Sequence, residues 1–205
     1  YGGIEMDLNT IFSVIGFIFS IFSLPSAIYF IVKKVIDRKH ISWKKVEKGT
    51  RYLAEEVETI NPDIIVTFSG RGGIAANLVL SRLKNKYPLY TCLLKDSMHS
   101  ESFLFPEEWI QFTTPKWICF VPNEILKYKD KQILIIDDIT RSGKTIEQLT
   151  KALIHNGIPA QNIHSMAFVA DFQIMKDMQI PQVSWKQVNT DEYSLPWNKA
   201  HNPKK

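Results

Sequence analysis

Two adjacent carboxylates, Asp137 and Asp138, directly follow the apolar run Ile133–Ile136. This run predicts a buried β-strand that delivers both acids to its carboxyl end, the edge where open α/β sheets bind ligands. The turn at 141–145 then offers two hydroxyls, a glycine and consecutive backbone N–H groups at the start of a predicted helix, which together can hold a phosphate. Carboxylates can bind sugar hydroxyls or Mg²⁺. The pattern therefore predicts a site for a ligand with hydroxyls beside a phosphate, such as a ribose 5-phosphate.

Two other interpretations of this run were weighed. Gly143-Lys144-Thr145 resembles the end of a Walker A motif, but that motif requires a glycine where this chain has Asp138. A P-loop NTPase is therefore disfavoured. In a purely structural interpretation the two acids only cap the following helix, although two adjacent acids at a buried strand end are costly without a positive or hydroxylated partner.

The elements that must position this site alternate between strand and helix. Apolar runs predict strands at 64–68, 90–94, 117–121, 132–136, 163–169 and 183–188, and helical periodicity predicts helices at 43–60, 74–83 and 145–155. This alternation predicts an α/β fold with a mostly parallel, twisted sheet flanked by helices. Residues 95–115 show no clear period, and a stretch of that length in a compact domain is predicted to be a functional lid or disordered.

Four segments carry a resemblance to the type I phosphoribosyltransferases. The run 133–145 resembles the family's motif for phosphoribosyl pyrophosphate. Ser69-Gly70-Arg71-Gly72-Gly73 is similar to the pyrophosphate loop of the xanthine-guanine branch. Ile41-Ser42-Trp43 is similar to the segment that opens that branch's catalytic domain, and Leu195-Pro196-Trp197 to the element that carries its purine site. The segments follow the family's order, which indicates a phosphoribosyltransferase-like domain at 41–198 that is closest to the xanthine-guanine and purine branch.

The resemblance implies a reaction and the residues for it. The family transfers ribose 5-phosphate from phosphoribosyl pyrophosphate to a nitrogenous base with Mg²⁺, and here a purine-like base is expected. By position, Asp137 and Asp138 would hold the ribose hydroxyls or the metal, and with Arg71 they form the expected catalytic set. For Arg71 the alternative is an exposed charge in a tight turn. The other expected contacts with phosphoribosyl pyrophosphate are Ser69, Gly70, Gly72, Arg141, Ser142, Gly143, Lys144, Thr145 and Lys95.

Departures from the family concern the base. Arg141 stands where the 6-oxopurine enzymes have an aspartate that serves as a general base, and an arginine cannot take that role at neutral pH. Asp171 lies near the position of a lysine that meets the 6-oxo group, so an amino group on the base is favoured there. The base-binding residues implied by the alignment are Asp171, Tyr193 and Trp197, with Tyr193 one step from the family's stacking position.

The segment before this domain predicts a membrane anchor. Residues 8–32 contain no charged side chain, which is long enough for a transmembrane helix; a signal peptide, an interfacial helix and a core helix are the alternatives. A tail at 1–7 precedes the span, and the basic linker at 33–40 places the domain in the cytoplasm and the N-terminus outside. Small residues recur along the span, which favours a homo-oligomer: Ser13, Gly16, Ser20, Ser23 and Ala27. Residues 199–205 form a C-terminal tail.

Composition limits the remaining function classes. The net charge of +4 is too mild to indicate direct nucleic-acid binding without a basic stripe. Cys92 and Cys119 show no metal-ligand spacing and are predicted to be reduced core thiols. Two alternatives to an enzyme stay open: a non-catalytic sensor of phosphoribosyl pyrophosphate or a nucleotide, and a partner-controlled effector that signals at the membrane.

Overall fold

The computed structural model describes residues 39–96, 109–114 and 116–201. Contacts divide the chain into two units, residues 1–39 and 40–205. The predicted membrane span at 8–32 lies outside the described residues, as do most of the basic linker and the end of the C-terminal tail. Within the described ranges, no helix combines the length and the apolar character needed to cross a bilayer.

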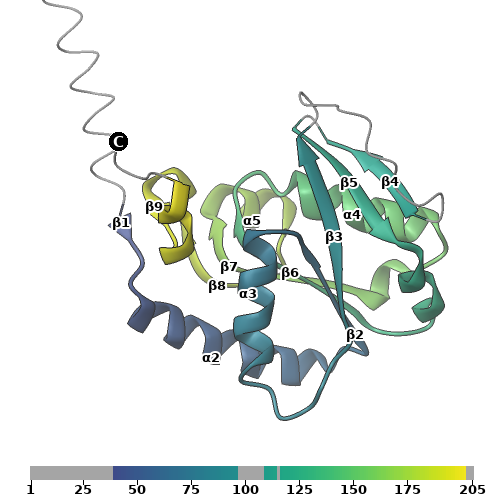
Figure 1. Ribbon diagram of the computed structural model, residues 1–205, viewed down its shortest axis with the longest axis horizontal. Helices are drawn as coiled ribbons and strands as arrows, with labels where there is room; N and C mark the ends of the chain where they lie inside the picture. The colour runs from purple at the N-terminus through teal and green to yellow at the C-terminus, as the bar shows by residue number, and fades with distance from the viewer. Residues whose placement is uncertain (1–38, 97–108, 115, 202–205) are drawn as a thin grey trace, which may run out of the picture. The chain divides into compact units, whose positions relative to one another are not determined.

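A seven-stranded sheet forms the centre of the second unit, in the order β4-β5-β3-β2-β6-β7-β8 (Figure 1). Strands β3, β2, β6, β7 and β8 are parallel to one another, and β5 and β4 continue the sheet in antiparallel pairing. The predicted mostly parallel α/β sheet is confirmed. The strands are β2 (Ile64–Phe68), β3 (Leu89–Asp96), β4 (Trp109–Thr113), β5 (Trp117–Pro122), β6 (Ile133–Thr140), β7 (Ile163–Asp171) and β8 (Val183–Val188).

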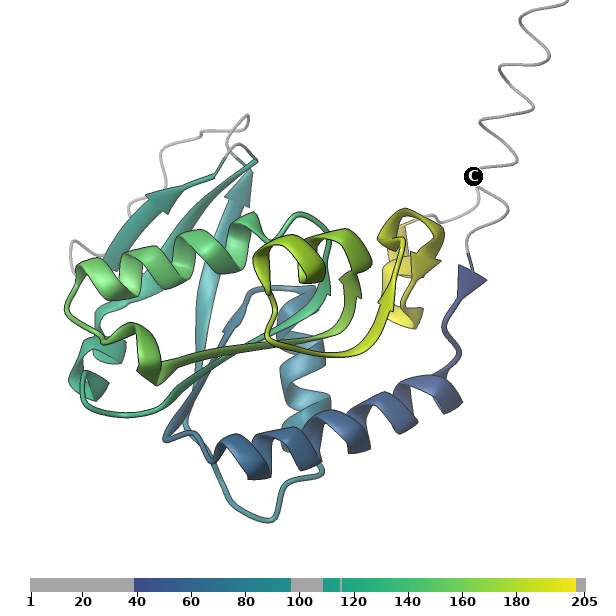
Figure 2. The same cartoon turned by 180° about the vertical axis from the view of Figure 1, so that it is seen from behind.

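Helices cover both faces of this sheet (Figures 1 and 2). The side chains of α2 (Trp43–Ile60) and α3 (Arg71–Leu80) pack on one face with Ile65, Leu134 and Ile136. Helix α4 (Lys144–His155) packs on the other face. Successive apolar residues of β2 and of the first half of β6 alternate between the two cores, which is why these runs could be recognised from sequence.

Several predicted boundaries match the structure. Helix α2 and strands β2 and β8 have the predicted bounds. The helix predicted at 74–83 instead begins at Arg71 and ends at Leu80, because Gly72 and Gly73, which weaken the helical signal, lie inside its first turn. Cys92 and Cys119 are buried free thiols, as predicted.

Several short or exposed elements were missed. The predicted lid is partly strand: Lys95 and Asp96 extend β3, and β4 is an edge strand whose half-exposed residues give a weak pattern. Helix α5 (Phe172–Met178) is only 7 residues long and has no buried residue, so it is too short to recognise from periodicity. The short strands β1 (Lys39–His40) and β9 (Tyr193–Ser194) form a separate sheet. The 3₁₀-helices are η1 (Asn123–Tyr128), η2 (Ala160–Asn162), η3 (Thr190–Glu192) and η4 (Pro196–His201).

Candidate active site

The topology brings two of the predicted loops together. Among the parallel strands, β2 comes first in the chain and lies between β3 and β6, so the chain changes direction across the sheet between β2 and β6. Ligands of open α/β sheets bind at the carboxyl ends of the strands at such a switch point. The loop after β2 contains Ser69 to Arg71, and the end of β6 contains Asp137 and Asp138. Both predicted loops therefore lie at the edge where the fold favours a ligand.

The two carboxylates at the end of β6 face different surroundings. The Asp138 N–H donates to Oδ1 of Asp137 at 2.8 Å, and the Ile139 N–H donates to Oδ1 of Asp138 at 2.8 Å. The other oxygen of Asp138 accepts a hydrogen bond from the indole Nε1 of Trp197 at 3.1 Å. Neither acid caps α4, since Gly143 is the N-cap residue and the cap lacks a side-chain hydrogen bond. The structural interpretation of the pair as helix caps is therefore wrong.

Burial raises the pKa values of both Asp137 and Asp138. Burial raises the pKa of Asp137 well above its usual range, and the neighbouring Asp138 charge adds to the rise. Burial also raises the pKa of Asp138, while the hydrogen bonds from Trp197 and the Ile139 amide and the positive charge of Arg71 oppose this rise. A bound cation or hydroxyl donors would stabilise the ionised pair.

The loop after β2 is built by glycine and by hydrogen bonds to β3. Gly70 adopts a positive φ of 78° as the N-cap residue of α3, and Arg71 is the exposed first residue of that helix. The Ser69 hydroxyl accepts a hydrogen bond from the Leu94 N–H at 3.0 Å, which extends the pairing of β2 with β3 and places the loop beside Lys95. A Cβ on Gly72 would lie 3.3 Å from Oδ1 of Asp137, a tight contact, so glycine eases this approach. The predicted pyrophosphate loop thus lies against the acidic pair.

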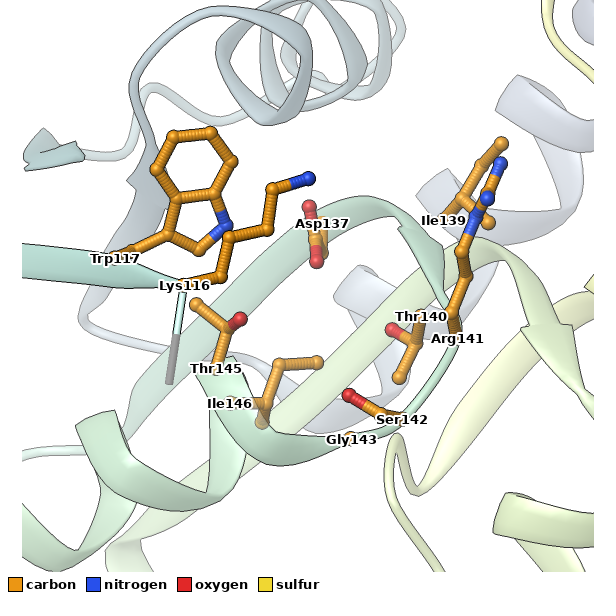
Figure 3. Close-up of a pocket in the computed structure, with 10 residues that line it drawn as sticks. All are labelled: Lys116, Trp117, Asp137, Ile139, Thr140, Arg141, Ser142, Gly143, Thr145 and Ile146. Carbon is orange, nitrogen blue, oxygen red and sulfur yellow. The ribbon is translucent and has the colours of Figure 1, made fainter. Parts of the chain in front are cut away.

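The turn after β6 forms one side of an open cavity of about 200 Å³ (Figure 3). Figure 3 shows the hydroxyls of Ser142 and Thr145 directed into this space, with Asp137 at its upper side. Gly143 has a positive φ of 68°, which lets the chain turn into α4. The side chain of Lys144 is exposed and is not among the described residues that line the cavity.

Three residues that line the cavity were missed by the sequence analysis. Lys116 and Trp117 come from the start of β5 and form the opposite side of the cavity, where Figure 3 shows the Lys116 amine extending toward Asp137. They precede the phosphate motif in the sequence and are not part of it. The antiparallel pairing of β5 with β3 brings them to the site. Thr140 ends β6 and lines the same cavity. Its polar side chain after an otherwise apolar strand was the available signal.

The three predicted base contacts have different environments. Trp197 packs edge-on against Phe168 with ring centroids 5.8 Å apart. The Lys186 amine lies 5.5 Å from the ring centroid of Tyr193. Asp171 caps α5 by accepting from the Gln173 N–H, and it also accepts hydrogen bonds from Thr190. Trp197 is joined directly to the acidic pair through its hydrogen bond to Asp138.

Arg141 lies beside an acidic side chain of η3. Its Nη1 lies 3.7 Å from Oδ1 of Asp191, and both side chains are substantially exposed. Because guanidinium stays protonated in proteins, Arg141 supplies a positive charge where the resemblance places a general base in the 6-oxopurine enzymes.

The described part of the chain does not by itself form a complete metal centre. Among the described residues, no group of three or more His, Cys, Asp or Glu side chains is arranged to hold an ion. Mg²⁺ is commonly held by one or two carboxylates with the remaining ligands from water and substrate phosphates. The acidic pair, with its raised pKa values, fits that mode of binding.

Comparison with known proteins assigns the family. Residues 41–202 match the phosphoribosyl transferase domain. The chain therefore belongs to the phosphoribosyltransferase family, a family of transferases. No curated protein matches the chain.

Solved structures show the same fold at low sequence identity. A purine phosphoribosyltransferase from Pyrococcus horikoshii Ot3 is 19% identical, with a TM-score of 0.57 over 78% of this chain and 93% of that one. An adenine phosphoribosyltransferase from Giardia lamblia complexed with 9-deazaadenine is 12% identical, with a TM-score of 0.56 over 70% and 80%. A hypothetical protein from Neisseria gonorrhoeae with bound ppGpp is 17% identical, with a TM-score of 0.56 over 80% and 92%.

Proposed function

We propose that this protein transfers the ribose 5-phosphate of phosphoribosyl pyrophosphate to a purine-like base and releases pyrophosphate. The observation that carries the proposal is the convergence of three parts at the switch point of the sheet: the glycine loop with Arg71, the acidic pair, and the cavity at the start of α4. These parts match the three portions of the substrate, namely pyrophosphate, ribose hydroxyls and 5′-phosphate. Family membership supports the same reaction.

In this reaction a bond forms between a base nitrogen and C1 of the ribose, and the bond from C1 to the pyrophosphate oxygen breaks. The transition state has oxocarbenium character, so the protein has to orient two reactants and neutralise the departing pyrophosphate. The backbone N–H groups and hydroxyls of the turn would hold the 5′-phosphate. Arg71 and the amides beside it would hold the pyrophosphate, since charge-assisted hydrogen bonds from arginine to phosphate are strong.

Asp137 and Asp138 would hold the ribose hydroxyls and Mg²⁺, which supplies charge neutralisation for the pyrophosphate when bound. Hydrogen bonding or a cation at this pair offsets the unfavourable burial of the two acids. The ionised acidic pair is therefore expected to be stable with its ligand bound and to cost folding free energy without it.

The base is proposed to lie beside Trp197 and Tyr193, with Asp171 as the acceptor for an amino group. The relatives with purine and adenine in their names support a purine-like base. Arg141 disfavours the 6-oxopurine mechanism in which an aspartate at that position removes a proton.

One observation favours a second candidate, a non-catalytic sensor of phosphoribosyl pyrophosphate or a nucleotide. Arg141 pairs with Asp191 and cannot accept a proton from a base. A sensor needs the phosphate and ribose sites but no proton acceptor for the base. Both candidates therefore bind the phosphorylated ligand, and only the transferase turns it over.

The deciding experiment measures binding and turnover on the same preparation of the full chain with Mg²⁺. Calorimetry with phosphoribosyl pyrophosphate tests the shared site, and pyrophosphate release across a panel of free bases tests the enzyme. Binding with release for one base supports the transferase, and binding without release for the whole panel supports the sensor. Failure of wild-type protein to bind phosphoribosyl pyrophosphate contradicts the transferase and a sensor of that ligand.

The cellular placement is a separate proposal. Residues 8–32 are proposed to anchor the domain on the cytoplasmic side of a membrane as a homo-oligomer, supported by the uncharged length of this segment and the basic residues after it. Membrane fractionation of the full chain, compared with a chain beginning at Ile41, tests the anchor. Recovery of the full chain in the soluble fraction would contradict it.

A further inference from the structure

Thr140 carries a buried hydroxyl that the protein itself leaves unpaired. The side chain is 3% exposed at the end of β6, and in the described part of the chain its Oγ1 is one of two buried side-chain atoms without a hydrogen-bond partner. Buried polar groups in folded proteins nearly always have a partner, because desolvation without a replacement hydrogen bond costs stability. The Thr140 hydroxyl therefore calls for a partner outside the chain.

Comparable buried threonines of this protein are paired within it. The Thr50 hydroxyl donates to the Val46 carbonyl at 3.0 Å, and the Thr67 hydroxyl donates to the Ile136 carbonyl at 2.8 Å. Thr190 bonds to Asp171 through its hydroxyl at 3.3 Å. The fold thus satisfies buried hydroxyls in its helices and strands, and Thr140 differs from them.

Thr140 lies where a ligand can supply the missing bond. It lines the cavity at the start of α4 together with Ser142 and Thr145. In Figure 3 the oxygens of these three side chains are directed toward the same space. The N-terminus of α4 adds backbone N–H groups and the positive end of the helix dipole to this set. Hydroxyl and amide donors that converge on one space favour an anionic acceptor, and phosphate is the acceptor that matches their number.

We propose that Oγ1 of Thr140 donates a hydrogen bond to the phosphate group of a ribose 5-phosphate ligand, and so adds a contact from the strand to those made by the turn at 141–145. The inference rests on the proposed function, because it takes the ligand of this cavity to be the 5′-phosphate end of the substrate. The hydroxyl hydrogen is committed to no protein acceptor and can turn to a phosphate oxygen. The ligand then compensates a cost that the ligand-free protein carries.

The test uses three variants of the full chain. Thr140→Val removes the hydroxyl with nearly the same shape, and Thr140→Ser keeps it. Thr50→Val is the matched control, since Thr50 has the same 3% exposure and a hydroxyl that is already paired in α2. Each protein is titrated calorimetrically with ribose 5-phosphate and with inorganic phosphate, and thermal unfolding is followed with and without ribose 5-phosphate.

Thr140→Val is expected to weaken both ligands roughly tenfold, without lowering the unfolding midpoint of the ligand-free protein. Thr140→Ser should keep most of the affinity, and Thr50→Val should lower the midpoint while leaving both affinities unchanged. Equal affinity of wild type and Thr140→Val would overturn the inference and leave the proposed function intact. A loss confined to ribose 5-phosphate would overturn the assignment to phosphate. Absence of binding to wild type would overturn the proposed function, and the inference with it.

Discussion

The indole Nε1 of Trp197 donates a hydrogen bond to Oδ2 of Asp138 at 3.1 Å. These residues are far apart in the sequence, one in η4 near the C-terminal end of the domain and the other at the end of β6. The same indole packs between Phe168 and Trp43, with centroid distances of 5.8 and 5.9 Å. The proposed base side of the site is thus joined to the carboxylate proposed for the ribose or Mg²⁺.

Replacement of this donor is predicted to change the pH dependence of the site. The hydrogen bond from Trp197 lowers the pKa of Asp138 against the effect of burial, so Trp197→Phe should raise that pKa further. Asp138 would then ionise only at higher pH, and the acid limb of pyrophosphate release should move to higher pH. A hydrogen bond to a charged group contributes about 1.5–3 kcal/mol, so activity on the acid side should fall about tenfold or more.

Trp43→Phe is the control for this variant. Trp43 contacts the Trp197 ring, but its own side chain is 58% exposed, and it is Trp197 whose indole donates to Asp138. Its replacement should leave the acid limb unchanged. An unchanged limb in Trp197→Phe as well would contradict a role for the indole in setting the ionisation of Asp138.

Asp137→Asn is predicted to stabilise the ligand-free protein while abolishing its binding of phosphoribosyl pyrophosphate. Because burial and Asp138 raise the folded-state pKa of Asp137 above its unfolded value, the ligand-free protein loses stability as pH rises between these two values. The amide cannot ionise, and its oxygen can still accept from the Asp138 N–H, so that loss should disappear. Denaturant unfolding from pH 4 to 8, alongside calorimetry with Mg²⁺ and the ligand, checks both effects. A variant that is less stable than wild type at pH 8 would contradict the prediction.

The sequence was sufficient to predict the central strands and the phosphate turn for one physical reason. Strands buried on both faces, such as β2 and the first half of β6, are mostly apolar, so the carboxylates of Asp137 and Asp138 are conspicuous after such a run. The family motif lies in the same run. In this run the local sequence pattern therefore predicts the same strand and turn that the tertiary environment requires.

The rest of the site depends on contacts between distant segments. Lys116 and Trp117 reach the cavity through antiparallel pairing of β5 with β3, for which no local pattern exists. The hydrogen bond from Trp197 to Asp138 depends on where η4 packs after the last strand. Asp171 was predicted to contact the base, and the sequence did not indicate that its carboxylate caps α5. Sequence periodicity reports burial within an element and says little about which elements meet.

Two adjacent glycines in α3 are predicted to respond in opposite ways to alanine. A Cβ on Gly73 would meet the Phe68 carbonyl oxygen at 3.7 Å, an ordinary contact, so Gly73→Ala should stabilise the helix by about 0.5–1 kcal/mol and leave activity unchanged. A Cβ on Gly72 would lie 3.1 Å from Oγ1 of Thr67 and 3.3 Å from Oδ1 of Asp137. Gly72→Ala should therefore offset the helical gain by crowding and displace Asp137, with pyrophosphate release reduced at least tenfold. Chemical denaturation and steady-state rates of the two variants, measured side by side, check both predictions. Equal activity in both variants would show that the close approach of α3 to Asp137 does not affect activity.

The charge of Lys116 is predicted to strengthen binding of the phosphorylated substrate. Lys116 lines the cavity from the side opposite the turn, and an exposed cation near a phosphate contributes up to about 1 kcal/mol in water. Lys116→Met should therefore weaken phosphoribosyl pyrophosphate about fivefold and reduce the dependence of its affinity on salt, because one screened attraction is removed. Lys131→Met is the matched control: this exposed lysine lies 3.6 Å from Asp63, before the amino end of β6 and thus at the other end of the strand from the acids. Calorimetric titrations at low and high salt should show a weaker salt dependence of the affinity in Lys116→Met than in Lys131→Met. An equal salt dependence in Lys116→Met and wild type would contradict a contact between Lys116 and the phosphate.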